Sequence, residues 1–200
     1  MIYSVRGKLI HKEPFLAVVE WGGVGYACRT TCMTASQLGE TGTEVSLYTY
    51  LYVREDNVEL FGFYSMQELN CFKMLISVSG VGPKAALSIL SDIDAQRFAL
   101  TIASGESKVF TKTKGVGPKL AQRIVLELKD KIAKENISAA DIKASGNVFV
   151  PAGDNCSEAV SALMVLGFSQ EEVASAVSKI DPALDTGEIV KQALKIIGNK

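Results

Sequence analysis

Hydrophobic residues in the first third of the chain gather in five short runs that are rich in β-branched and aromatic side chains, the composition typical of strands. Gly22-Gly23 lies between two of these runs and is a tight-turn signal. Five short strands within about 60 residues predict a small closed β-barrel of the oligonucleotide-binding (OB) type. The expected strands cover residues 2–10, 14–21, 24–30, 45–53 and 58–64, with one helical turn at 34–38.

From Ser65 onward the hydrophobic residues recur at intervals of three and four, which is the spacing of one face of an α-helix. Ser65 and Glu68 have the spacing of a capping box, so a helix is expected to begin there. The order helix, turn, helix then occurs twice, which predicts a compact helical domain with two similar halves. The helices expected after the first one cover residues 84–91, 94–103, 108–113 and 119–134.

The periodic pattern is lost in residues 135–155, where Gly, Pro, Asn, Ser and Ala predict a flexible linker. Beyond the linker the pattern predicts three short helices, with a break at Gly167 and helix starts at Ser169 and Asp185. The fold class is therefore α+β with three domains. They are a barrel in residues 1–63, a double helix-turn-helix domain in residues 64–134 and a three-helix bundle in residues 156–200.

One five-residue motif occurs twice in the helical domain. Residues 80–84 have the sequence Gly-Val-Gly-Pro-Lys, and residues 115–119 repeat it 35 positions later. Glycine permits a positive φ and lets backbone N–H groups approach a phosphate, and a helix N-terminus favours anions. Proline suits the first helical position, where no N–H is required. The two turns together predict one surface that binds a nucleic-acid backbone at two places.

The expected phosphate-binding residues include the glycines, a lysine in each copy, and Arg123, which lies one helical turn beyond Lys119. The valine of each copy is expected to pack inward and hold the turn between its helices. Contacts to phosphates carry no base sequence, so the site is expected to select DNA structure or to bind duplex nonspecifically. The complete set is Gly80, Val81, Gly82, Lys84, Gly115, Val116, Gly117, Lys119 and Arg123.

The distribution of charge agrees with this interpretation. The whole chain has a formal net charge of −1. Residues 64–134 alone carry 11 Lys and Arg against 6 Asp and Glu, a local net charge of +5. A local excess of positive charge steers polyanions toward a surface even when the total charge is near zero.

Several other classes of protein fit the sequence less well. Residues 80–85 match a loose dinucleotide-binding fingerprint, but a helix and not a strand is expected before them. No phosphate-binding loop of the ATPase type is present, so ATP hydrolysis by this chain is not expected. Two alternatives stay open: a helix-hairpin-helix DNA repair enzyme, either a glycosylase or a nuclease, and an adaptor that binds only proteins.

The composition predicts a soluble, cytoplasmic protein. In the preferred interpretation no catalytic residues, no cofactor and no metal site are expected. The four cysteines are scattered and His11 is the only histidine, so a set of four zinc ligands is not evident. The thiols are expected to be reduced. No apolar run reaches the roughly 18–20 residues of a membrane span. The first residues also lack the charged segment followed by an apolar segment that is typical of a signal peptide.

An ordered set of motifs along essentially the whole chain resembles the RuvA family, the Holliday-junction-binding subunits of the bacterial branch-migration complex. These motifs are Ile2-x-x-x-Arg6-Gly7, Gly22-Gly23-Val24-Gly25-Tyr26, Val53-Arg54-Glu55-Asp56, Leu60-x-Gly62-Phe63, the two Gly-Val-Gly-Pro-Lys turns, Glu127-Leu128-Lys129-Asp130 and Ala162-Leu163-x-x-Leu166-Gly167-Phe168. A single helix-hairpin-helix is common to many repair proteins, whereas this ordered set is far more specific.

The resemblance implies an OB barrel, a tandem helix-hairpin-helix domain and a mobile C-terminal bundle similar to ubiquitin-associated domains. It implies a non-catalytic subunit that binds four-way DNA junctions in homologous recombination and DNA repair, as part of the SOS response to DNA damage. It further implies a homotetramer, or an octamer of two tetramers enclosing the DNA. The implied partners are the hexameric ATPase RuvB, which would hydrolyse the ATP, and the resolvase RuvC.

Two further sites follow from the same resemblance. Glu55 and Asp56 correspond to the family's acidic pin, a pair of carboxylates on a loop of the barrel that would face the crossover and repel phosphates. The loop after the first helix of the bundle is implied to contact the motor RuvB, although its apolar residues are also expected to form the core of so small a bundle. The implied motor contacts are Leu163, Leu166, Gly167 and Phe168.

Overall fold

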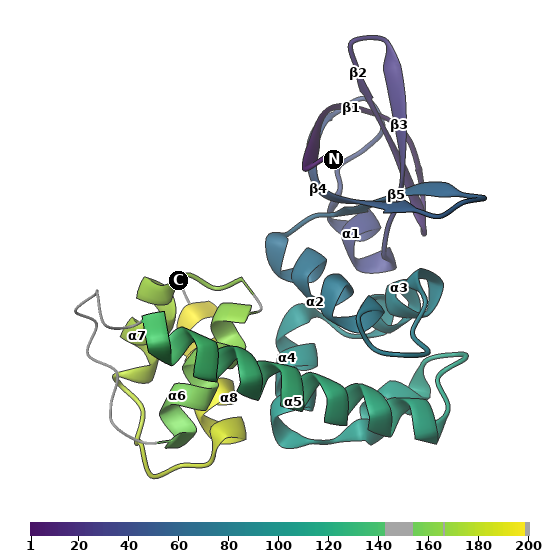
Figure 1. Ribbon diagram of the computed structural model, residues 1–200. Helices are drawn as coiled ribbons and strands as arrows, with labels where there is room; N and C mark the ends of the chain where they lie inside the picture. The colour runs from purple at the N-terminus through teal and green to yellow at the C-terminus, as the bar shows by residue number, and fades with distance from the viewer. Residues whose placement is uncertain (143–153, 166, 199–200) are drawn as a thin grey trace.

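The strands of the first 63 residues close into a barrel, as the sequence predicted, and their order in it is β1-β2-β3-β5-β4 (Figure 1). The computed structural model describes residues 1–142, 154–165 and 167–198. Neighbouring strands are antiparallel except β3 and β5, which are parallel. The strands are β1 (Ser4–Glu13), β2 (Leu16–Trp21), β3 (Val24–Arg29), β4 (Glu44–Val53) and β5 (Val58–Phe63).

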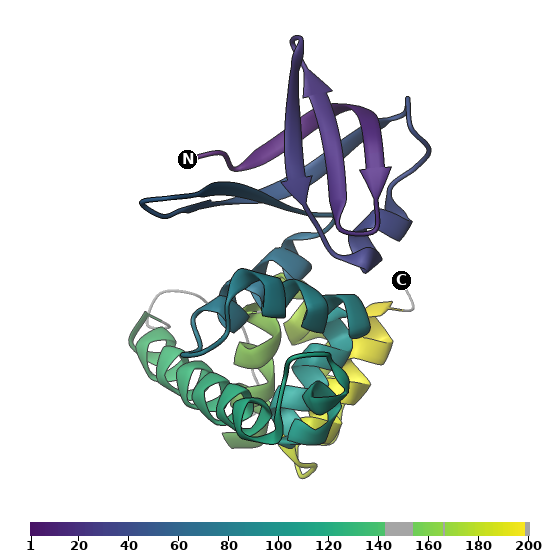
Figure 2. The same cartoon turned by 90° about the vertical axis from the view of Figure 1, so that its right-hand side faces the viewer.

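Apolar side chains fill the barrel, and one short helix lies at its base. The buried side chains in this interior are Val5, Leu9, Ala17, Val19, Cys28, Leu38 and Leu47. The helix α1 (Cys32–Gln37) connects β3 to β4, and the Thr31 hydroxyl accepts a hydrogen bond from the Thr34 N–H at its start. Figure 2 shows the barrel standing on the helical part of the molecule, with α1 between them.

The helical domain begins directly after β5 and contains the two predicted helix-turn-helix units. Its elements are α2 (Met66–Ile76), α3 (Pro83–Asp92), α4 (Ala95–Ser104), the 3-10 helix η1 (Ser107–Lys112) and α5 (Pro118–Ile142). The predicted caps are present at α4, where the Asp94 carboxylate accepts from the Arg97 N–H at 2.7 Å and Gly105 ends the helix with φ +81°.

The helix α5 is longer than the sequence predicted. It continues to Ile142, whereas an end at Lys134 and a flexible linker over residues 135–155 were expected. The prediction was wrong for residues 135–142 because they contain Ala, Ser and Asn but no Gly or Pro, so nothing interrupts the helical hydrogen bonds. The next part of the predicted linker, residues 143–153, lies outside the described residues.

The C-terminal bundle consists of α6 (Asp154–Val165), α7 (Gln170–Val177) and α8 (Thr186–Gly198). Its start at Asp154 is two residues earlier than predicted. Ser169 and Glu172 form the predicted capping box completely. The bundle packs on the helical domain, with α6 against α5 and α8 against α4, and the two share one hydrophobic core (Figure 1).

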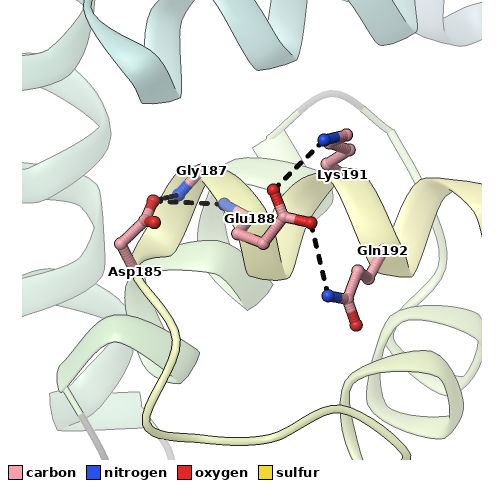
Figure 3. A network of polar contacts seen from close by, with 5 residues as sticks. All are labelled: Asp185, Gly187, Glu188, Lys191 and Gln192. Carbon is pink, nitrogen blue, oxygen red and sulfur yellow. Dashed lines mark hydrogen bonds and ion pairs between the residues drawn. The ribbon is translucent and has the colours of Figure 1, made fainter.

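The start of α8 is capped by Asp185, as expected, but Glu188 does not complete a box. The Asp185 carboxylate accepts from the N–H groups of Gly187 and Glu188 at 2.9 and 3.2 Å (Figure 3). The Glu188 carboxylate instead accepts from Gln192 and Lys191 further along the helix, at 3.3 and 3.2 Å. These hydrogen bonds, with that from Gln192 the stronger influence, lower the pKa of Glu188.

Candidate nucleic-acid interface

The two Gly-Val-Gly-Pro-Lys turns have the same backbone geometry. Gly80 has φ +91° and Gly115 has φ +89°, a region that favours glycine because it has no Cβ. The Val81 N–H donates to the carbonyl of Val78 at 3.1 Å, and the Val116 N–H donates to the carbonyl of Thr113 at the same distance. The sequence repeat is therefore a structural repeat, in which the offset of 35 residues is kept.

Each turn ends at the first residue of a helix. Gly82 is the N-cap of α3 and Pro83 its first helical residue, and no side chain caps this end by a hydrogen bond. The first closed helical turn is identical in both copies: the Ala86 N–H donates to the Gly82 carbonyl, and the Ala121 N–H to the Gly117 carbonyl, both at 3.0 Å. The uncapped N–H groups and the helix dipole give the start of α3 a positive partial charge.

The second glycine of each motif is not required by packing within the chain. A Cβ on Gly82 or Gly117 would meet no other atom within 4 Å. The φ of Gly82 is −87°, which any residue adopts. Because neither strain nor crowding calls for glycine here, the open space in front of these two residues is available for the close approach of a ligand.

The side chains of the two motifs divide as the sequence predicted. Val81 and Val116 are buried, with 6% and 4% of their surface exposed, and they hold each turn to the core. Lys84 and Lys119 are exposed. Among the residues that the structure describes, neither lysine has an ion-pair partner.

Arg123 connects the two turns. It lies on α5, the helix that begins at the second turn, but its guanidinium donates to the Ser79 carbonyl in the first turn at 3.4 Å. Glu127, on the same face of α5, accepts from the Ser79 N–H at 3.4 Å and lies 3.9 Å from the Arg123 guanidinium. Lys131 donates to the Ser77 carbonyl at 2.9 Å. One helix thus holds both turns in a fixed relation.

Sequence reasoning missed the residues that support this arrangement. Ser79, Glu127 and Lys131 take part through contacts over 48 to 54 positions of sequence, which no local pattern indicates. Lys114 was not in the expected set either, although it is an exposed lysine that directly precedes Gly115. Its position beside a predicted phosphate-binding turn was the signal that could have identified it.

Glu55 and Asp56 form the tip of the β4–β5 hairpin. The flanking residues exchange backbone hydrogen bonds, the Arg54 N–H donating to Asn57 at 2.8 Å and the Asn57 N–H donating to Arg54 at 3.4 Å. The hairpin projects beyond the barrel on the side of the molecule where α5 begins (Figure 1). The two carboxylates are therefore held on a tight, two-residue loop on the side of the second turn.

Both carboxylates at this tip are exposed. In the described part of the chain no cation pairs with either of them. The nearest cation in sequence, Arg54, donates to the Tyr52 hydroxyl and lies 5.2 Å above the ring of Tyr52. The negative charge of the tip is consequently not neutralised by its neighbour.

The residues implied to contact the motor differ in how far they are buried. Leu163 is fully buried in the bundle, and Leu166 lies outside the described residues. Gly167 has φ +94° and ends α6 in a Schellman motif. In this motif the Gly167 N–H donates to the Met164 carbonyl at 2.9 Å, and the Phe168 N–H donates to the Leu163 carbonyl at 3.2 Å. Phe168 is half-buried and lines a cavity of about 420 Å³ with Gln67 of α2.

Other chemistry is limited in the described residues. No group of three or more His, Cys, Asp or Glu side chains among them is arranged to hold a metal ion. The four cysteines are free thiols, as expected, and burial raises the pKa of Cys28 to about 12. No helix within the described ranges is long and apolar enough to cross a membrane.

Three family models match the chain in succession. The RuvA N terminal domain matches residues 1–62, the SAM-like helix-hairpin-helix tandem matches residues 72–130, and the RuvA C-terminal domain matches residues 154–198. The chain is also similar over its length to curated proteins named Holliday junction branch migration complex subunit RuvA. The protein from Acetivibrio thermocellus is 49% identical over 98% of both chains, and that from Ruminiclostridium cellulolyticum is 44% identical over 98% of this chain and 99% of its own.

Proposed function

Since the chain belongs to the RuvA family of Holliday junction branch migration complex subunits, we propose that it binds four-way DNA junctions through its two glycine turns. Each subunit holds one arm of the junction. The phosphates of that arm contact the backbone N–H groups of the turns, and Lys84, Lys119 and Arg123 add positive charge. The observation that carries this proposal is the identical geometry of two exposed turns, held together by α5.

The open space at Gly82 and Gly117 supports a phosphate contact in preference to a purely structural role. A glycine that served only as a helix cap would be explained by its φ or by crowding, and neither applies at Gly82. The positive end of α3 and the two lysines face outward, where a polyanion has access. Such contacts recognise the shape of the DNA and not its sequence.

The pin residues Glu55 and Asp56 give the site its second component. Unpaired carboxylates repel phosphates, and the repulsion grows where solvent is excluded. In a fourfold assembly the tips of four hairpins would meet at the crossover and keep the strands apart. A continuous duplex has no such opening, so the pin would disfavour it relative to a junction.

The protein itself breaks no covalent bond in this proposal. It is a homotetramer, or an octamer of two tetramers on DNA, and acts in the cytoplasm during recombination and repair. The hexameric ATPase RuvB supplies the energy and is recruited by the C-terminal bundle, while the nuclease RuvC resolves the junction. Phe168, in the loop that follows α6, is half-buried and is the described side chain of the implied contact loop that retains access to a partner.

Salt dependence tests the phosphate contacts. With roughly 6–10 phosphates contacted, the affinity for a four-way junction should fall about 10³- to 10⁵-fold between ~50 and ~200 mM salt. Fluorescence anisotropy with a labelled, immobile junction at several salt concentrations measures the slope. An affinity that does not change over this range would contradict the phosphate contacts.

Recruitment of the motor is tested by Phe168→Ala. We expect this variant to bind junctions as the wild type does but to lose most of its stimulation of RuvB ATPase activity, because an aromatic contact is removed from the implied loop. Met164→Ala is the matched control, since Met164 is likewise a partly exposed apolar residue but lies in α6, before the loop. Normal stimulation by the Phe168 variant would place the motor contact elsewhere.

A further inference from the structure

A buried carboxylate lies between the barrel and the helical domain. Glu68, in the first turn of α2, is only 8% exposed. Its two oxygens accept hydrogen bonds from the hydroxyls of Thr31 and Thr34, the second at 2.5 Å. Both threonines are fully buried and belong to the start of α1, on the barrel side. The sequence predicted a capping box of Ser65 and Glu68, and half of it is present, because the Ser65 hydroxyl accepts from the Glu68 N–H at 3.2 Å and caps α2. The other half was predicted wrongly, because the Glu68 carboxylate turns to α1 instead.

The same hydroxyls also accept hydrogen bonds from the backbone. The Thr31 hydroxyl accepts from the Thr34 N–H, and the Thr34 hydroxyl accepts from the Tyr64 N–H, both at 2.9 Å. Each hydroxyl therefore donates one hydrogen bond and accepts another, which restricts its orientation. The network joins α1, the connection between β5 and α2, and α2 itself. A separate hydrogen bond of 3.0 Å, from the Cys32 N–H to the Ser91 hydroxyl, joins α1 to α3.

The two domains are also joined by aromatic packing. Phe72 of α2 packs against Phe61 and Phe63 of β5, with ring centroids 5.0 and 4.9 Å apart, and against Tyr50 of β4 at 5.7 Å. The hydrophobic attraction is largely non-directional, and aromatic pairs accept more than one ring arrangement, so this packing alone tolerates a small rotation of one domain on the other. Hydrogen bonds to an ionised carboxylate are short and strongly directional.

The burial of the Glu68 carboxylate lowers the stability of the fold when its hydrogen bonds are left out of account. Burial raises the pKa of its carboxyl, and the hydroxyls of Thr31 and Thr34 offset this only in part. Burying a charged group in place of an apolar one requires compensating hydrogen bonds, and an apolar residue of similar size often gives equal stability. The group has no place in the DNA-binding surface described above. Its most direct physical effect is to fix one orientation of α1 on α2.

We propose that Glu68, with Thr31 and Thr34, is a positioning residue that sets the angle between the barrel and the helical domain and thereby the preference for junctions over duplex. The acidic tip of residues 55–56 belongs to the barrel, whereas both glycine turns belong to the helical domain (Figure 1). The distance between the acidic tip and the glycine turns therefore depends on the interface between the barrel and the helical domain. The inference rests on the proposed junction binding, because selectivity is the property that the angle controls.

The test compares two variants of Glu68. Glu68→Leu keeps a side chain of similar size but has no hydrogen-bond acceptor, whereas Glu68→Gln keeps the shape of the side chain and one acceptor oxygen. We expect Glu68→Leu, which removes both hydrogen bonds from α1 to the carboxylate, to reduce the ratio of junction affinity to duplex affinity about tenfold. Its affinity for plain duplex should change little, because both turns are intact. Glu68→Gln should restore most of the ratio.

Thr49→Val is the matched control. Thr49 is also buried, and its hydroxyl donates to the Ile2 carbonyl at 2.9 Å, but this hydrogen bond lies within the barrel. The variant should lose thermal stability without any change in the junction-to-duplex ratio. If it lowers the ratio as much as Glu68→Leu does, general destabilisation is the cause and the proposal is wrong.

A distance measurement gives a readout that does not depend on DNA. Spin labels at the exposed positions Val24 of the barrel and Leu126 of α5 should give one narrow distance distribution in the wild type and a broader one in Glu68→Leu. An unchanged distribution and an unchanged ratio would overturn the proposal. Should Glu68→Leu not fold, Thr31→Val removes one donor and is judged by the same two measurements. A wild-type protein without junction preference would refute the proposed function, while the distances would still decide the role of Glu68.

Discussion

Replacing both Lys84 and Lys119 by glutamate is expected to reduce the affinity for four-way junctions by at least about 10³-fold, because two phosphate contacts per subunit become two repulsions. Both side chains are exposed, and within the described ranges neither takes part in an ion pair, so the fold should be retained. Anisotropy with a labelled junction measures the affinity, and thermal unfolding verifies the fold.

The control for this variant carries the same change in total charge at another place. Lys179 and Lys195 are exposed residues of the C-terminal bundle, outside the proposed interface. Replacing both by glutamate should lower junction affinity only slightly, through the long-range field. If the Lys84 and Lys119 variant binds junctions as well as this control does, the two turns are structural and the proposed interface is wrong.

Neutralising the tip of the β4–β5 hairpin, by Glu55→Gln with Asp56→Asn, is expected to leave junction affinity unchanged or tighter and to weaken the preference for junctions. The carboxylates are exposed and unpaired in the described part of the chain, so their removal breaks no ion pair there. A phosphate about 4 Å from a carboxylate is repelled by roughly 1 kcal/mol in water, and more where water is excluded. Affinity for continuous duplex should therefore increase more than affinity for a junction.

Competition between labelled junction and unlabelled duplex measures this preference directly. The matched control is Glu20→Gln with Glu40→Gln, which removes two exposed carboxylates from other parts of the barrel domain. The control should change both affinities equally, since it alters only the overall charge. A clear loss of junction affinity in the Glu55 and Asp56 variant would show that the tip attracts the DNA and does not repel it.

The local geometry of the two turns could be predicted from the sequence because it depends on neighbouring residues. The positive φ of Gly80 and Gly115, the inward valines and the helix starts at proline all follow from five consecutive residues in each copy. The barrel was predictable for the same reason, since its strands are short, rich in β-branched residues and separated by clear turn signals.

Features that depend on tertiary contacts were not predictable. Arg123 was expected to lie near the second turn, and its contact with Ser79 of the first turn follows only from the packing of α5 across the domain. Ser65 caps α2 as expected, but the Glu68 carboxylate does not complete the capping box, because two buried hydroxyls from α1 bind it instead. A local signature states what a side chain can bond, but a partner from a distant segment decides which bond forms.

The contact between the C-terminal bundle and the helical domain was likewise not indicated by sequence. The family resemblance implied a mobile bundle, whereas in the structure α6 and α8 pack against α5 and α4. Helices this short have apolar faces that any neighbouring helix can cover, so their partner cannot be identified from periodicity.

The most direct test is an electron cryomicroscopy structure of the protein bound to an immobile four-way junction. We expect phosphate oxygens within about 3 Å of backbone N–H groups at the Gly80–Lys84 turn and at the Gly115–Lys119 turn of every subunit. The carboxylates of residues 55 and 56 should lie at the crossover without contacting a phosphate. A complex in which both turns face away from the DNA would contradict the proposed interface.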